Sequence, residues 1–337
     1  MTDCCSGWRY HRDVLHSPGR QITPSSLEEA LGPDLVEVLG RMRLRSRKIF
    51  AGKLPGERRS KKRGQSVEFD DFREYVRGDD LRHIDWNVYA RLEKLFLKLF
   101  LEEEDLALHI AIDCSRSMEA GRPPKLDLAR RLAVAVAYVG LSNQDRVSLW
   151  AFGVPGRPPL LRMPPVRGRA GANRLLEFVY QQAVPLPGEV TTSRPELVPA
   201  LLRLSRSRVG KGVLVVLSDF LTEEDLTPAL NAMAFAQGGG FDTILVQVLA
   251  PGELDPTTEA DAGLLGDVML TDVESGRTAE VTITPSLIAQ YRSRLKAHND
   301  RLARLSGARG IGHVLVPSDT PVREILTGSL RRHGVLS

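Results

Sequence analysis

From residue 106 to the C-terminus, short apolar runs alternate with longer stretches in which apolar residues recur three or four positions apart. Short runs rich in Val, Ile and Leu are typical of buried parallel strands, and the longer period is typical of helices. The pattern predicts strands at residues 106–113, 146–152, 213–217 and 243–249, helices at 126–141, 173–182, 196–206, 223–237 and 285–306, a hairpin across 268–283, and a final strand and helix. This order predicts an α/β fold with a mostly parallel sheet and helices on both faces.

The first part of the chain has a different pattern. Residues 1–25 are polar and show no period, which predicts a flexible leader. Residues 26–48 place apolar side chains at helical spacing after a serine and two acids, which predicts one helix. Residues 64–104 are rich in aromatic and charged side chains and predict a small β subdomain with a strand at 95–101, for which Trp86 is the expected apolar anchor. We therefore expect three parts, at residues 1–25, 26–104 and 105–337.

The composition is that of a globular chain. With 337 residues, of which 42% are hydrophobic and 26% charged, it can bury a substantial core. The longest uninterrupted apolar segment, residues 132–141, is far shorter than the roughly 20 residues that cross a bilayer. The N-terminus lacks the apolar core of a signal peptide, and the three cysteines offer neither a disulfide framework nor a CxxC zinc pair. These features predict a cytoplasmic protein.

Charge is unevenly distributed along the chain. Residues 41–63 contain eleven Lys or Arg side chains against one acid, Glu57. Such a segment could bind nucleic acid, an anionic membrane surface or an acidic protein partner. A solvated helix face followed by a loop explains it equally simply, and we favour that interpretation.

The most informative polar cluster follows the apolar run at residues 110–112. Asp113, Ser115 and Ser117 have the spacing DxSxS and come directly after a predicted strand. One carboxylate and two hydroxyls form a plausible partial shell for a hard divalent cation such as Mg²⁺. Alternatively, the motif is a turn rich in Asp and Ser that caps the helix beginning near Lys125.

A second acid, Asp219, follows another predicted strand. Because ligands of open α/β sheets gather beyond the carboxyl ends of the strands, Asp113 and Asp219 are expected to face the same edge. Residues 188–193, between them in sequence, include Thr191 and Thr192 and could add a hydroxyl there. This constellation resembles the metal-ion-dependent adhesion site of von Willebrand factor A domains, which have a Rossmann-like sheet wrapped by helices. The resemblance implies that Asp113, Ser115 and Ser117 form the first ligand loop, that Thr192 or Thr191 supplies the second, and that Asp219 acts from the third around Mg²⁺ or Mn²⁺.

A further resemblance covers more of the chain. The segments that carry it are GERRS at 56–60, VEF at 67–69, REY at 73–75, GDDLRHIDW at 78–86 and AR at 90–91, followed by Lys98, Glu103 and the DxSxSM motif. In this order they look like the signature of bacterial proteins named domain of unknown function 58. The resemblance implies a role beside MoxR-type AAA+ ATPases, as an adaptor or chaperone partner.

The charged signature itself allows three interpretations. Asp79, Asp80, Arg82, Asp85 and Arg91 could form ion pairs inside the subdomain, contact a partner, or take part in catalysis. Internal pairing is favoured because acids and arginines are mixed within a short segment, and buried charges must be paired.

Motifs typical of enzymes are absent from the sequence. No GxSxG, Walker-type GxxxxGK[ST] or HExxH occurs, and no histidine in the nearby strand-end loops could act as a base for Ser115. We therefore expect a non-enzymatic, metal-dependent protein-binding adaptor, in which an Asp or Glu of the partner fills an open position on the cation. Two alternatives stay open: a metal-dependent hydrolase that uses Asp113 and Asp219, and a nucleic-acid or anionic-surface binder that uses residues 41–63.

Overall fold

A computed structural model describes residues 8–10, 23–45, 69–75, 84–100, 106–185, 197–207, 212–235, 241–257, 266–272 and 278–337. The chain divides into two compact units, one made of residues 1–54 and 106–337 and the other of residues 55–105. The small unit therefore ends where the sequence predicts a boundary. The helical segment after residue 26 belongs to the larger unit, and this differs from the expected grouping because its leucines Leu31, Leu35 and Leu39 pack into the main core.

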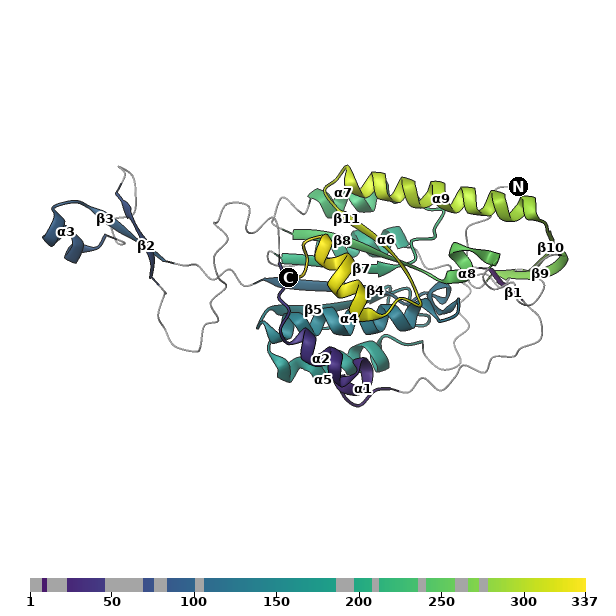
Figure 1. The fold of residues 1–337 in the computed structure, drawn as a ribbon, viewed down its shortest axis with the longest axis horizontal. Helices are drawn as coiled ribbons and strands as arrows, with labels where there is room; N and C mark the ends of the chain where they lie inside the picture. Colours follow the sequence, from purple (N-terminus) through teal and green to yellow (C-terminus); the bar gives the residue numbers. More distant parts are fainter. Residues whose placement is uncertain are drawn as a thin grey trace. The chain divides into compact units, whose positions relative to one another are not determined.

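The larger unit is built on a six-stranded sheet (Figure 1). Its strands are β4 (Ala107–Asp113), β5 (Arg146–Phe152), β6 (Leu160–Arg162), β7 (Gly212–Ser218), β8 (Phe241–Leu249) and β11 (Gly312–Pro317). They lie in the order β11-β8-β7-β4-β5-β6, and neighbours are parallel except that β6 runs antiparallel to β5. The predicted α/β fold with a mostly parallel sheet is confirmed.

Helices cover both faces of this sheet. They are α1 (Leu27–Leu31), α2 (Pro33–Leu39), α4 (Lys125–Ser142), α5 (Ala172–Glu177), α6 (Leu197–Ser207), α7 (Thr227–Phe235), α8 (Pro251–Leu254), α9 (Pro285–Gly307) and α10 (Val322–Glu324), with a last turn, η7, at Ile325–Leu330. Alternate strand residues point to opposite faces, so Leu108, Ile110 and Ile112 of β4 join a core with α1, α2, α4, α5 and η7. Ala107 and Ala111 join a second core with α6, α7 and α9.

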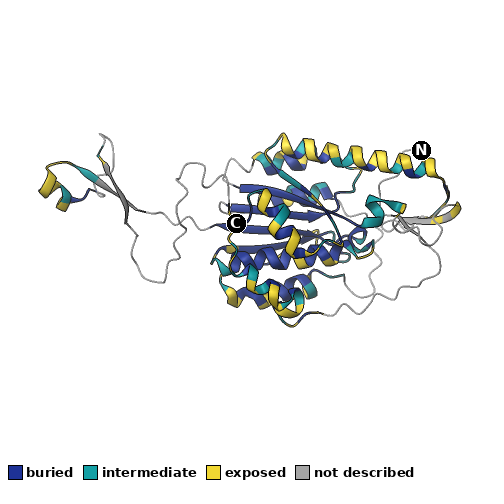
Figure 2. Cartoon of the chain, viewed as in Figure 1, coloured by how far each residue is buried: buried dark blue, intermediate teal, exposed yellow. Residues whose placement is uncertain are grey.

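Helix α4 is the centre of the first core. Fifteen of its eighteen residues are buried, including the charged Lys125 and Arg130 (Figure 2). A helix that is apolar nearly all round is typical of a fully buried position, as the sequence predicts for the second half of this helix. The outer side of α9, in contrast, is exposed and rich in arginine.

The single helix predicted at residues 26–48 is wrong. Ser26 does cap α1, since its hydroxyl accepts from the Glu29 N–H at 3.2 Å. The chain then breaks at Gly32, which has φ of 87°, and Pro33 starts α2. A residue before proline disfavours the helical region, and glycine adopts positive φ without strain, so Gly32-Pro33 ends one helix and begins another.

A small antiparallel sheet accompanies the large one. The predicted hairpin is confirmed as β9 (Gly266–Asp272) and β10 (Thr278–Ile283). A third strand, β1 (Trp8–Tyr10), pairs with β9 and comes from the expected leader. Among the described residues, no helix has both the length and the apolar character needed to cross a membrane.

The small unit consists, where it is described, of β2 (Phe69–Glu74) paired with β3 (Phe96–Phe100), and of α3 (Trp86–Leu92). Trp86 was expected to be its apolar anchor, and this is wrong, because 62% of the residue is exposed. It stands at the first position of α3 and packs edge-on against Tyr89 at a ring distance of 6.1 Å, while Leu92 lies exposed further along the helix. Ile84 and Asp85 are buried instead.

The alignment of β4 with β7 leaves no room for a side chain at Gly212. A Cβ atom built there would lie 1.8 Å from the Ala107 carbonyl oxygen of the neighbouring strand. We expect Gly212→Ala to lower the free energy of unfolding by roughly 3 kcal/mol, because the strand backbones must separate. Gly307→Ala is the matched control, since a Cβ atom there meets nothing within 4 Å. Urea denaturation followed by circular dichroism measures both, and equal stabilities would contradict the close approach.

Candidate functional site

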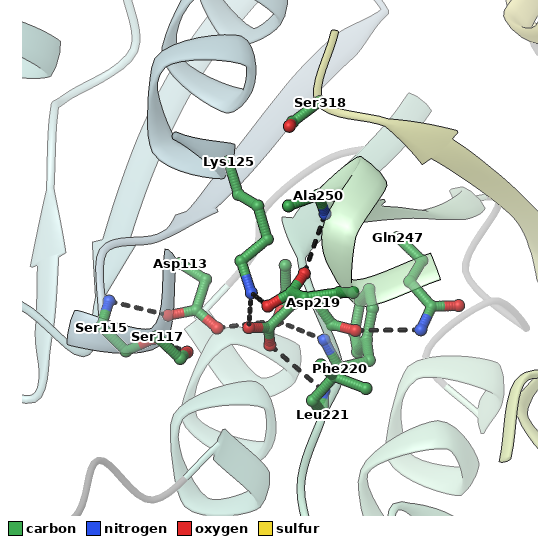
Figure 3. Close-up of polar contacts among 12 residues, drawn as sticks. Asp113, Ser115, Ser117, Lys125, Asp219, Phe220, Leu221, Gln247, Ala250 and Ser318 are labelled. Carbon is green, nitrogen blue, oxygen red and sulfur yellow. Dashed lines mark hydrogen bonds and ion pairs between the residues drawn. The ribbon is translucent and has the colours of Figure 1, made fainter. Parts of the chain in front are cut away.

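Two acids meet where β4 and β7 end. Asp113 is the last residue of β4 and Asp219 directly follows β7. The two strands are adjacent and in register, with Ile112 opposite Leu217, so both carboxylates lie at the same edge of the sheet (Figure 3). Both residues are buried, with 5% and 3% exposure. The structure thus brings together the two acids that the sequence placed at this edge.

The DxSxS loop folds tightly after β4. The Ser115 N–H donates to Asp113 Oδ1 at 3.0 Å, and a short 3-10 helix at Arg116–Glu119 brings Ser117 Oγ to 3.0 Å from Ser115 Oγ. Asp113, Ser115 and Ser117 therefore present their oxygens close together. Gly153 closes this loop from the end of β5, with φ of 70°, and a Cβ atom there would lie 3.1 Å from Asp113 Oδ1.

The alternative that the motif caps the helix near Lys125 is wrong. Helix α4 begins after Pro124, which makes no side-chain capping bond. The hydroxyls of Ser115 and Ser117 bond each other instead, within a buried loop. Cys114, between Asp113 and Ser115 in the sequence, is buried, and burial raises the pKa of its thiol to about 12.

The sequence reasoning missed Ser218, whose hydroxyl joins the two acidic loops. It donates to Asp113 Oδ2 at 2.7 Å and accepts from the Phe220 N–H at 3.0 Å. Phe220 holds φ of 51°, the left-handed region that is rare for a bulky residue. Gln247 and His298 secure this loop, since Gln247 Nε2 donates to the Asp219 carbonyl at 2.9 Å and His298 Nε2 lies 3.0 Å from the Phe220 carbonyl oxygen.

A lysine ammonium was also missed. Lys125, the first residue of α4, has a side chain with 0% exposure, and its Nζ donates to Asp219 Oδ2 at 2.8 Å and to Glu253 Oε1 at 2.5 Å. Glu253 lies on α8 and its other oxygen accepts from the Ala250 N–H at 2.8 Å. Nothing local in the sequence marks these residues, because Lys125 is separated from its partners by 94 and 128 positions.

Burial controls the protonation of the cluster. Desolvation, aided by the charge of Asp219, raises the pKa of Asp113 to about 6, against the hydrogen bonds from Ser218 and Ser115. Burial alone would lower the pKa of Lys125, but the charges of Asp219 and Glu253 outweigh it and raise that pKa. Burial also raises the pKa of Glu253, against the nearby Lys125. Within the part of the chain that the structure describes, Lys125 pairs with two carboxylates, those of Asp219 and Glu253, and the donors on Asp113 are neutral groups, so these three acids carry more charge than the ammonium offsets.

The donor set of the DxSxS loop fits a hard divalent cation. Asp113 supplies a carboxylate whose hydrogen-bond donors, among the residues described, are neutral, and Ser115 and Ser117 supply hydroxyl oxygens. Asp219 lies beside them, while its Oδ1 accepts from the Leu221 N–H at 3.1 Å and its Oδ2 from Lys125. Thr191 and Thr192, predicted as the second ligand loop, lie outside the described residues.

The described flanks of that threonine segment are both anchored. Before it, an Arg130 guanidinium N–H donates to the Ala183 carbonyl at 3.2 Å. After it, the Leu197 and Val198 N–H groups donate to the two oxygens of Glu224 at 3.2 and 3.0 Å. These bonds hold the described residues on either side of the segment in place.

Of the charged signature residues, Asp79, Asp80 and Arg82 also lie outside the described residues. Asp85 caps α3, because its Oδ1 accepts from the Asn87 and Val88 N–H groups at 2.9 and 3.3 Å. Arg91 is exposed on the same helix. Asp85 therefore has a structural role that the sequence interpretation did not assign to it.

The raised pKa of Asp113 makes stability depend on pH. Because the folded state holds this proton more tightly than the unfolded chain, its stabilising effect is present below pH 4 and is lost as the pH rises through about 6. In the absence of divalent cations we expect this group to lower the free energy of unfolding by about 2 kcal/mol between pH 4 and pH 8. Asp113→Asn removes that decrease, whereas Asp225→Asn, at an exposed acid, retains it. Urea denaturation across this pH range measures the difference, and parallel curves for Asp113→Asn and the unmodified chain would contradict the shift.

Comparison with known proteins places the chain in a family. Uncharacterized proteins of Mycobacterium bovis and Mycobacterium tuberculosis are each 28% identical to it over 287 residues, which is 84% of this chain and 84% of each relative. Among solved structures, an aerotolerance-related membrane protein from Bacteroides fragilis covers 65% of this chain and 96% of its own, with 16% identity and a TM-score of 0.39. A pilus adhesin, SpaC from Lactobacillus rhamnosus GG, covers 68% of this chain and 31% of its own, with 12% identity and a TM-score of 0.39. The family model described as "Protein of unknown function DUF58" matches residues 71–301, and the chain belongs to this family.

Proposed function

We propose that this chain is a non-enzymatic, cation-dependent protein-binding module with a von Willebrand factor A-type domain. Mg²⁺ or Mn²⁺ would be held by Asp113, Ser115 and Ser117, with Asp219 acting beside them and Thr192 or Thr191 as the remaining ligand. When bound, the cation supplies an open coordination position that a carboxylate of a partner protein fills. The mostly parallel sheet with helices on both faces supports the domain type.

The observation that carries the proposal is the excess of buried negative charge beside a ready set of oxygen donors. Among the described residues, the Lys125 ammonium bonds to Asp219 and Glu253, whereas Asp113 accepts hydrogen bonds from neutral groups. Buried charge without compensation is strongly unfavourable, and here it raises the pKa of Asp113. A divalent cation beside Asp113 offsets more of this buried negative charge than a monovalent cation does.

The bonding of the hydroxyls favours recognition over catalysis. A serine nucleophile needs a base of its own, and the Ser115 hydroxyl lies 3.0 Å from the Ser117 hydroxyl and interacts with Asp113, the carboxylate that would hold the cation. Asp219 is poorly placed as a general base for hydrolysis, because both of its oxygens accept hydrogen bonds, one of them from an ammonium. The metal-dependent hydrolase is therefore kept as an outcome of the tests below.

We propose a MoxR-type AAA+ ATPase as the partner, and a shared cytoplasmic location. This rests on the family signature in the sequence. The basic segment at residues 41–63, of which residues 41–45 are described, is a second contact for an acidic surface of that partner. Nucleic acid is the rival ligand for this segment.

The cation site predicts the effect of removing its carboxylate. We expect Asp113→Ala to abolish the binding of Mn²⁺ and Mg²⁺, because the hydroxyls of Ser115 and Ser117 alone bring no charge to the ion. Isothermal titration calorimetry of the full chain measures the binding. Asp225→Asn is the matched control at an exposed acid and retains full affinity.

Undiminished binding by Asp113→Ala would overturn the cation site. Metal-dependent turnover of phosphoesters or peptides by the unmodified chain, lost in Asp219→Ala, would establish the hydrolase instead.

The adaptor role predicts a cation-dependent complex. We expect the chain to capture a MoxR-type AAA+ ATPase encoded beside it in Mg²⁺, and to lose it in EDTA or with Asp113→Ala, since the cation bridges the two proteins. Pulldown of the purified proteins, quantified on gels, measures this. Capture that is insensitive to EDTA would contradict bridging by the cation. Capture that is lost at high salt but not in EDTA would assign the contact to the basic residues 41–63.

A further inference from the structure

The proposed function assigns Lys125 no contact with the cation or with the partner. Its side chain is fully buried at the start of α4, although lysine is seldom buried without a reason. Its ammonium lies between Asp219 Oδ2 and Glu253 Oε1, at 2.8 and 2.5 Å. The Lys125 ammonium therefore has two specific carboxylate partners at the edge of the sheet.

The two acids at the strand ends are not equivalent. Asp113 accepts hydrogen bonds from neutral groups, the Ser115 N–H and the Ser218 hydroxyl. Asp219 accepts one from the Leu221 N–H and one from the Lys125 ammonium. A charge-assisted bond is stronger than a neutral one, so Asp219 is the acid less available to a metal ion.

Glu253 keeps the ammonium in place. Its Oε2 accepts from the Ala250 N–H at 2.8 Å, and its backbone carbonyl accepts from the Tyr291 hydroxyl at 2.7 Å. Helix α8 is thus tied both to the end of β8 and to α9. With its second partner fixed in this way, the Lys125 ammonium is held beside Asp219.

Resting on the proposed cation site, we propose that Lys125 is a positioning residue that holds Asp219 back from the divalent cation. The cation then takes a single carboxylate, that of Asp113, together with hydroxyls and water. One carboxylate on a doubly charged ion leaves one positive charge, and this charge attracts the carboxylate of a partner. With Asp219 also bound to it, the ion would be neutral and a poor ligand for a further acid. Lys125 therefore lowers the affinity of the site for the metal ion and raises its affinity for an acidic partner.

The test frees Asp219 without changing the net charge of the cluster. Lys125→Met combined with Glu253→Gln removes one positive and one negative charge, and leaves no unpaired Glu253. We expect this double variant to bind Mn²⁺ about tenfold more tightly than the unmodified chain, because Asp219 becomes a ligand. Acetate, used as the carboxylate probe, should bind the protein-held Mn²⁺ about tenfold more weakly. Competition electron paramagnetic resonance measures the first affinity, and water-proton relaxation measures the second.

A third substitution shows whether Asp219 causes the gain. Adding Asp219→Asn to the double variant should return the Mn²⁺ affinity to a value at or below that of the unmodified chain. A merely structural role of Lys125 would weaken both affinities together, so opposite changes separate positioning from support of the fold. Unchanged Mn²⁺ and acetate affinities in a folded double variant would overturn the role of Lys125.

Glu253→Gln alone provides a matched variant that keeps the ammonium on Asp219. It should bind Mn²⁺ no more tightly than the unmodified chain and acetate at least as well. If the double variant fails to fold, this single variant carries the test, and tighter Mn²⁺ binding with weaker acetate binding would overturn the proposal. Failure of the unmodified chain to bind Mn²⁺ at all is a different result, because it removes the cation site of the proposed function itself.

Discussion

The buried ion pair between Lys125 and Asp219 joins the start of α4 to the end of β7, and the arrangement of the sheet edge depends on it. A buried ammonium must be paired, since an uncompensated charge in the interior typically costs about 3–5 kcal/mol. Glu253 brings α8 into the same constraint. Three segments distant in the sequence are thus required to meet at one point, and Asp113 on the neighbouring strand β4 is placed beside them by the register of β4 with β7.

The register of β4 with β7 depends in turn on close backbone contacts at which a larger side chain would not fit. Gly212 lets the β7 backbone lie against the Ala107 carbonyl, and Gly153 lets the end of β5 approach Asp113 and Ser115. Helix α4 buries its apolar side chains against β4 and carries Lys125 at its first turn. The same helix therefore stabilises the core and supplies the Lys125 ammonium. The stability of the fold and the geometry of the acidic cluster depend on one element.

Regular packing was predictable from the sequence, and the long-range polar contacts were not. Strands β4, β7 and β8 and helix α4 are marked by apolar runs because burial on both sides of a sheet leaves few polar positions. Asp113 and Asp219 could be predicted at one edge because they end two such strands. Lys125 and Glu253 could not, because a buried charged residue has the same letter as an exposed one and its partner is far away in the chain. Gly32-Pro33 did mark the break between α1 and α2, whereas the aromatic content around Trp86 gave no sign of its exposure.

A site that binds both a metal ion and a partner's carboxylate has two opposing requirements. In this cluster, Asp113 and Asp219 differ in their hydrogen-bond partners, and each can meet one of them. Binding a metal ion tightly calls for several carboxylates on it, whereas attracting a partner's carboxylate calls for a positive charge left over. In the proposed function, Asp113 serves the first demand and the pairing of Asp219 with Lys125 serves the second. An enzyme would instead need one acid free to accept a proton, and neither oxygen of Asp219 is free of a donor. In the proposed function, the ion pair that joins α4 to β7 therefore also serves the recognition of an acidic group.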